Sequence, residues 1–224
     1  MIQAFSLAIA QLGDRNFRRP LVLGLSGAAL VFVALWIGLW LLLTRTHLFA
    51  IGWLDTVVAA LGELAAIGLA FILYPAVAAS LIALFLDQVV DAVEARHYPG
   101  MPPPRRIGLG EQLKSAARLL LLAIVLNLLV LPVYFLPPIN LLVFYALNGY
   151  ILGREYFELV AARRLDPPDV SRAWRDHRWG ALAMGAVIAF LSTLPLINLV
   201  APLVGVAAMT HQLMSWGVAR GSSK

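Results

Sequence analysis

Apolar residues in this 224-residue chain gather in long uncharged runs. Residues 20–43 form a run of 24 residues without a charge, and residues 64–86 form a second run of 23. At about 1.5 Å per residue, a helix made from either run is long enough to cross a hydrocarbon layer of about 30 Å. The pattern therefore predicts two full transmembrane helices, at 20–43 and 64–86.

The later apolar runs are shorter and are interrupted by turns. Residues 119–136, 139–153 and 179–194 form runs of 18, 15 and 16 residues. Helices of these lengths reach roughly 22–27 Å, a little short of the hydrocarbon layer. We therefore predict two deeply inserted, hemi-penetrating helical hairpins, at 119–163 and 179–219. Two pairs of fully spanning helices are the alternative.

The turns of the two hairpins share the motif Leu-Pro-x-Ile-Asn-Leu, at residues 136–141 and 194–199, and neither motif carries a charge. Irregular backbone at membrane depth must be packed against protein or line a wet cavity. Asn is a favoured N-cap, and a helix N-terminus carries a partial positive charge that can hold an anion. The alternative is that each Asn only satisfies the free N–H groups of its helix. The predicted hairpin tips and helix caps are Pro137, Asn140, Pro195 and Asn198.

Two polar segments flank the first spans. At the N-terminus, apolar side chains recur at helical spacing, which predicts an amphipathic helix lying in the membrane interface over residues 1–19. Residues 87–118 are the most polar region and contain Met101-Pro-Pro-Pro104, which a helix cannot include in its interior. We expect a short helical extension followed by a solvated cytoplasmic linker.

Composition places the whole chain in a membrane. The sequence is 61% hydrophobic and 13% charged, whereas a soluble domain has about 25% charged residues. With the predicted spans, sixteen of the seventeen Lys and Arg residues fall on one face and Arg45 lies opposite. The positive-inside rule then places both termini in the cytoplasm. Membrane orientation accounts for the net charge of +5 better than a nucleic-acid partner does. We predict one multi-pass membrane domain over residues 1–224.

The apolar runs contain no ionisable side chain between 20 and 43, 64 and 86, 119 and 153, or 179 and 210. An intramembrane enzyme or proton-coupled pump would place such groups in its spans. The chain has no cysteine, and its four histidines do not have metal-ligand spacing. We therefore predict no enzyme activity, no metal site and no cofactor. Arg154 and Glu158, four residues apart, are interpreted as a structural ion pair.

Arg18 and Arg19 directly precede Pro20, which suits the first position of a helix. Two arginines beside free backbone N–H groups can bind an oxyanion such as sulfate or phosphate. The alternative is that they are charges that set the membrane orientation and contact lipid phosphates.

Two motifs resemble the CysZ-like sulfate permease family and its relatives, the etoposide-induced-protein superfamily. One is Leu147-Asn-Gly-Tyr-Ile-Leu-Gly-Arg-Glu-Tyr-Phe-Glu158, which follows Pro137-Pro-Ile-Asn140, and the other is Leu194-Pro-Leu-Ile-Asn-Leu-Val-Ala-Pro202. The resemblance implies two transmembrane helices and two partly penetrating hairpins, assembled as oligomers. It also implies that Arg18 and Arg19 match the family's sulfate-site arginines, whereas Asn16 and Phe17 stand where the family has Gly and Leu.

The residues and the resemblance together lead to an expected function. We expect a homo-oligomeric permease or channel that imports sulfate, or a related oxyanion, across the bacterial inner membrane for sulfur assimilation and cysteine biosynthesis. Its expected partners are the oxyanion and membrane lipids. The alternative is a membrane scaffold or partner-binding protein of the same superfamily, without transport.

Overall fold

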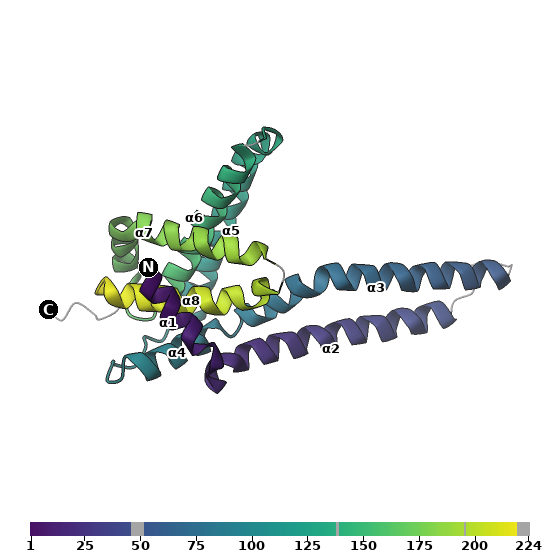
Figure 1. The fold of residues 1–224 in the computed structure, drawn as a ribbon, viewed down its shortest axis with the longest axis horizontal. Helices are drawn as coiled ribbons and strands as arrows, with labels where there is room; N and C mark the ends of the chain where they lie inside the picture. The colour runs from purple at the N-terminus through teal and green to yellow at the C-terminus, as the bar shows by residue number, and fades with distance from the viewer. Residues whose placement is uncertain (46–51, 138, 195, 219–224) are drawn as a thin grey trace. The chain divides into compact units, whose positions relative to one another are not determined.

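The computed structural model describes residues 1–45, 52–137, 139–194 and 196–218. Within these residues the chain is helical, which confirms the predicted all-helical class (Figure 1). The α-helices are α1 (Ile2–Ala10), α2 (Arg15–Arg45), α3 (Gly52–Ala83), α4 (Leu86–His97), α5 (Leu109–Val130), α6 (Ile139–Ala161), α7 (Pro167–Thr193) and α8 (Ile197–Ser215). Two short 3₁₀ helices, η1 (Gln11–Gly13) and η2 (Leu131–Phe135), follow α1 and α5.

Four stretches of the described chain are long and apolar enough to cross a membrane. They are Phe17–Leu42, Ala60–Ala83, Leu109–Phe135 and Ile197–Ser215. The protein is therefore a multi-pass membrane protein. Insertion of α5 to α8 as two hairpins that stop within the bilayer stays a prediction.

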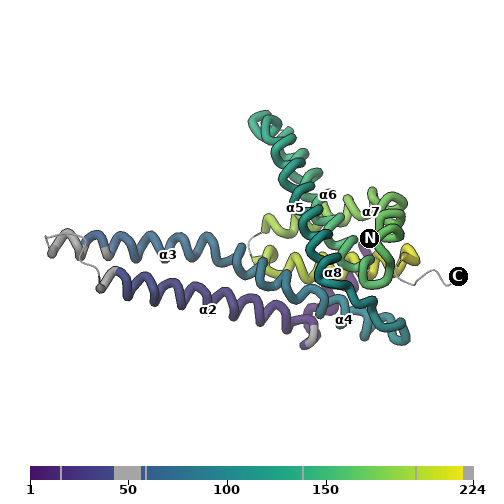
Figure 2. The backbone as a smooth tube through the Cα atoms, turned by 180° about the vertical axis from the view of Figure 1, so that it is seen from behind, coloured from purple at the N-terminus to yellow at the C-terminus, as the bar shows by residue number. Residues whose placement is uncertain are grey.

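Residues 19–85 form one compact unit, in which α2 and α3 lie side by side (Figures 1 and 2). The two helices approach closely at Gly24, where an added Cβ would lie 3.0 Å from the backbone nitrogen of Ile82. The Tyr74 hydroxyl donates a hydrogen bond of 3.0 Å to the carbonyl oxygen of Leu25. Most apolar side chains of this pair are exposed, as expected for helices that face lipid.

Residues 1–18 and 86–224 form the other unit, which is built around α8. From Leu203 to Met214 every residue of α8 is buried, and the helix packs against α1, α4, α6 and α7. In contrast, α5 contains no buried residue. The helix α1 contributes Ala4 and Ala8 to the core, and Ile2 and Ile9 are exposed.

Glycines set the crossing of α6 and α7. An added Cβ on Gly149 would lie 2.9 Å from the Cα of Ala186, and one on Gly153 would overlap the carbonyl oxygen of Ala181. On the facing helix, an added Cβ on Gly185 would overlap the carbonyl oxygen of Gly149. The two backbones are in direct contact, which is the arrangement that small residues four positions apart allow in membrane helices.

The segment predicted as a linker, 87–118, contains more helix than its polarity indicated. It holds most of α4 and the first ten residues of α5, so α5 begins well before the uncharged run that starts at Leu119. The irregular part is residues 98–108, which contain the three consecutive prolines.

Candidate functional site

Arg18 and Arg19, the pair predicted to bind an anion, lie in the first turns of α2 with exposed side chains. Within the described residues neither guanidinium has an ion-pair partner. The predicted helix start at Pro20 is wrong, because α2 begins at Arg15 and Pro20 is its sixth residue. As a consequence the N–H group of Arg18 already donates a hydrogen bond of 3.0 Å to the carbonyl oxygen of Asp14. Anion binding at Arg18 and Arg19 stays a prediction. The guanidinium groups would bind the anion, because the backbone N–H group of Arg18 is already used within the helix.

Both copies of the Leu-Pro-x-Ile-Asn-Leu motif contain the same backbone hydrogen bond. The N–H group of Asn140 donates to the carbonyl oxygen of Leu136 at 3.1 Å, and that of Asn198 donates to Leu194 at 2.9 Å. Both asparagines are the second residue of their helices, α6 and α8, and the N-cap of α8 is Leu196. The predicted capping role of Asn198 is therefore wrong.

Both asparagine side chains are half-buried, and within the described part of the chain neither amide has a hydrogen-bond partner. These amides are therefore available to a ligand. Pro137 lies in the first turn and is exposed. Pro195, the other predicted tip proline, lies outside the described residues.

Arg154 and Glu158 form the predicted pair on α6. The Nε of Arg154 lies 2.8 Å from the Oε1 of Glu158, and both side chains are nearly buried. The guanidinium also donates to the hydroxyl of Tyr150 at 3.2 Å and lies 5.5 Å from the ring centroid of Trp174. The hydroxyl of Ser115 donates to the second carboxylate oxygen of Glu158 at 3.1 Å. The pair therefore ties α6 to both α5 and α7.

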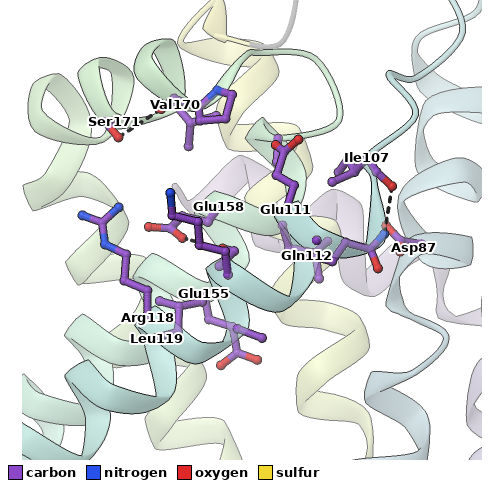
Figure 3. Close-up of a pocket in the computed structure, with 17 residues that line it drawn as sticks. Asp87, Ile107, Glu111, Gln112, Arg118, Leu119, Glu155, Glu158, Val170 and Ser171 are labelled. Atoms are coloured by element: carbon purple, nitrogen blue, oxygen red, sulfur yellow. Dashed lines mark hydrogen bonds between the residues drawn. The ribbon is translucent and has the colours of Figure 1, made fainter.

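A pocket of about 700 Å³ lies beside this pair, between the start of α5, the end of α6 and the start of α7 (Figure 3). We call it the α5–α6 pocket. Its polar lining includes Glu111, Lys114, Ser115, Arg118, Glu155 and Glu158, and its apolar lining includes Leu119, Leu159 and Val170. Sequence analysis did not find this pocket, because its residues come from four segments that are separated along the chain.

Glu155 is the one of these carboxylates that lacks a partner within the described residues. It is half-buried, and the loss of hydration raises the pKa of its carboxyl above the ordinary value of 4.5. Glu158 is held by Arg154, and Glu111 accepts two hydrogen bonds from Arg105.

Two buried arginines after α6 pair with carboxylates of α4 in an ionic cluster that sequence analysis missed. The side chain of Arg163 is 8% exposed and pairs with Asp87 at 3.0 Å and with Asp91. The side chain of Arg164 is 5% exposed and lies 2.5 Å from Glu94, and it also donates to the carbonyl oxygen of Pro102. The cluster fastens α4 and the proline-rich loop to the end of α6.

Two signals in the sequence could have indicated the ionic cluster on α4 and the close contact between α6 and α7. The acidic residues of α4 stand at positions 87, 91 and 94, a spacing that places them on one helix face. The residues Gly149-Tyr-Ile-Leu-Gly153 form a GxxxG motif, which is typical of helix contacts in membranes.

A histidine pair is also brought together by the fold. The hydroxyl of Tyr98 lies 2.8 Å from the Nδ1 of His211, and the rings of His97 and His211 meet edge to face with centroids 4.8 Å apart. The Nε2 atoms of both histidines are buried without a hydrogen-bond partner in the described chain. Two imidazoles are fewer than the three or four ligands typical of a zinc site.

Comparison with known proteins is consistent with this architecture. A search of curated proteins finds no match to this chain. The family described as sulfate transporter CysZ/etoposide-induced protein 2.4 matches residues 4–202, which include most of α1, all of α2 to α7 and the beginning of α8. The chain therefore belongs to the sulfate transporter CysZ/etoposide-induced protein 2.4 family.

Proposed function

We propose that this protein is a permease or channel that carries sulfate, or a related tetrahedral oxyanion, across the bacterial inner membrane for sulfur assimilation. The observation that carries the proposal is the family match over residues 4–202, because this family includes the sulfate transporter CysZ. The four long apolar helices support it, since a transported ion needs a protein that crosses the bilayer.

Two sets of polar groups are the proposed contacts for the anion. Arg18 and Arg19 have exposed guanidinium groups without ion-pair partners in the described chain, and guanidinium binds oxyanions through paired hydrogen bonds. The free side-chain amides of Asn140 and Asn198 lie at the turns between apolar helices. An uncharged amide can donate to an anion at membrane depth without a second buried charge.

The proposed arrangement in the membrane follows the charges. Both termini and the bases of two hemi-penetrating hairpins lie in the cytoplasm, because sixteen of the seventeen basic residues then share that face. Assembly into a homo-oligomer is part of the proposal and follows from the resemblance to the family; the exposed apolar surface of α5 is available to a second chain or to lipid. Transport is passive, because the apolar runs contain no carboxylate or histidine to relay protons.

Uptake of labelled sulfate into liposomes tests this proposal. Purified protein should give uptake above that of empty liposomes, and Arg18→Ala/Arg19→Ala should reduce the initial rate by about tenfold or more, because each charged hydrogen bond contributes about 1.5–3 kcal/mol. Arg175→Ala/Arg178→Ala is the matched control. It removes the same charge from two exposed arginines of α7 and should leave uptake unchanged.

Two results would contradict the proposal. The intact protein, reconstituted and folded, could give no more uptake than empty liposomes. Alternatively, the control variant could lose as much uptake as the Arg18 and Arg19 variant, which would indicate a general effect of charge rather than a site. Absence of uptake together with co-purification of one specific protein would favour the scaffold function.

A further inference from the structure

The two basic side chains that line the α5–α6 pocket, Lys114 and Arg118, have no ion-pair partner within the described residues. Asp87, Glu111 and Glu158 line it, but each of these carboxylates is paired with an arginine, Arg163, Arg105 or Arg154 respectively. The unpaired charged groups of the lining are Lys114, Arg118 and Glu155, within the described residues. Two cations therefore face one half-buried carboxyl whose pKa is raised by burial.

The two cations stand where the chain enters its apolar region. Lys114 and Arg118 are four residues apart on α5, so they lie on one face of the helix. Arg118 is the last charged residue before the uncharged run 119–136. A basic pair at the end of an apolar span lies at the level of lipid headgroups.

Part of the remaining lining of the pocket is apolar. Leu119 follows Arg118 directly, and Leu159 and Val170 come from α6 and α7. In Figure 3, Arg118 and Leu119 project from α5 beside Glu155 and Glu158 of α6. The volume of about 700 Å³ is within the range of about 300–1,000 Å³ for sites of organic ligands.

We propose that the α5–α6 pocket binds an anionic phospholipid. Its phosphodiester is bound by Lys114 and Arg118, and one acyl chain lies along Leu119, Leu159 and Val170. An inorganic phosphate or sulfate ion shares the headgroup chemistry, but it would leave the apolar wall of the pocket uncovered. A zwitterionic lipid would place its own cation beside the two basic side chains, which disfavours it. This inference does not depend on transport.

Native mass spectrometry of the full-length protein in detergent tests the proposal, with phosphatidylglycerol and phosphatidylcholine of identical acyl chains as probes. One phosphatidylglycerol should be retained per chain in preference to phosphatidylcholine. Lys114→Ala/Arg118→Ala should weaken this binding by about tenfold or more, because each basic residue near a membrane surface contributes about 1 kcal/mol. Both side chains are exposed and unpaired within the described chain, so this variant should fold.

Two further variants distinguish the effect of the two positive charges on lipid binding from the effect of the space in the pocket. Lys114→Arg/Arg118→Lys keeps both charges and should retain the lipid. Ala162→Phe adds a ring to the pocket lining without changing a charge, and it should also reduce retention. Arg175→Ala/Arg178→Ala is the control for total charge and should bind as the unmodified protein does.

Three outcomes would overturn the proposal. Equal retention of phosphatidylglycerol and phosphatidylcholine would show that the pocket does not distinguish lipids by the charge of the headgroup. Unchanged binding in Lys114→Ala/Arg118→Ala would place the lipid elsewhere. Displacement of phosphatidylglycerol by inorganic phosphate or sulfate, with the same residues binding the free ion, would assign the pocket to a soluble oxyanion.

Discussion

The arginines of this protein differ in how deeply they are buried and in how many carboxylates they contact. Arg163 is a buried guanidinium that contacts three carboxylates, Asp87, Asp91 and Glu94. Arg172 makes one ion pair with Asp169, and both side chains are exposed. A buried charge depends on its partners, because water cannot replace them, whereas an exposed pair contributes little.

Arg163→Ala should therefore lower the free energy of unfolding by about 2–4 kcal/mol. The loss is below that for a wholly buried pair because Asp87 and Asp91 are exposed. Unfolding midpoints in detergent measure the difference. Arg172→Ala is the control and should change the free energy by less than about 1 kcal/mol. Equal losses in the two variants would mean that the cluster contributes no more than a surface pair.

At the scale of helices, the backbone contact between α6 and α7 decides how the unit formed by residues 1–18 and 86–224 packs. Gly153 has no room for a side chain, since its added Cβ would overlap the backbone carbonyl of Ala181. Backbone atoms cannot rotate away as a flexible side chain can. A larger residue must therefore separate the two helices along their contact.

Gly153→Val should destabilise the protein by about 3 kcal/mol or shift it to an aggregated state, because overpacking a tight contact costs about 1–3 kcal/mol or more. Monodispersity in detergent and the unfolding midpoint measure the effect. Gly68→Ala is the matched control within α3, where an added Cβ meets nothing within 4 Å. It should be neutral or stabilising by up to about 1 kcal/mol. A Gly153→Val protein as stable as this control would contradict the tight crossing.

The two Leu-Pro-x-Ile-Asn-Leu turns have one backbone hydrogen bond in common, and the second turn also contains an unusual backbone conformation. Asn140 and Asn198 have the same backbone hydrogen bond, four residues back along the chain. The second motif also contains Leu196 with a φ of 66°, a conformation that a leucine rarely adopts. The repeat was recognisable in the sequence. The position of each helix start was not, since it depends on local geometry that composition does not determine.

For the whole molecule, the absence of cysteine provides a direct test of the membrane arrangement. Single cysteines can be placed at Pro103 in the polar loop and at Leu136 and Leu196 beside the two turns, all exposed positions. A membrane-impermeant maleimide should label position 103 from the cytoplasmic side only. Positions 136 and 196 should not react from the opposite side, because hemi-penetrating hairpins end within the bilayer.

Efficient labelling of positions 136 and 196 from the opposite side would contradict this arrangement and would favour fully spanning pairs. Labelling of position 103 from outside would reverse the proposed orientation. The unmodified chain, which contains no cysteine, is the control for non-specific reaction.

The sequence by itself determined the helical class, the membrane location and the family. These follow from run length, from the low fraction of charged residues and from local motifs, all of which are properties of neighbouring residues. The sequence also determined the Arg154 and Glu158 pair, because a separation of four residues on a helix is enough to bring two side chains together.

Only the tertiary structure decided which apolar helix is buried and which cations are compensated. The helices α5 and α8 are both apolar enough to span a membrane, yet α5 is exposed and α8 is the centre of its unit. The buried Arg163 finds its partners 72 and 76 residues away along the chain. Hydropathy measures the preference of a segment for an apolar environment. It does not distinguish lipid from protein, so the packing partner of each helix is decided by the fold.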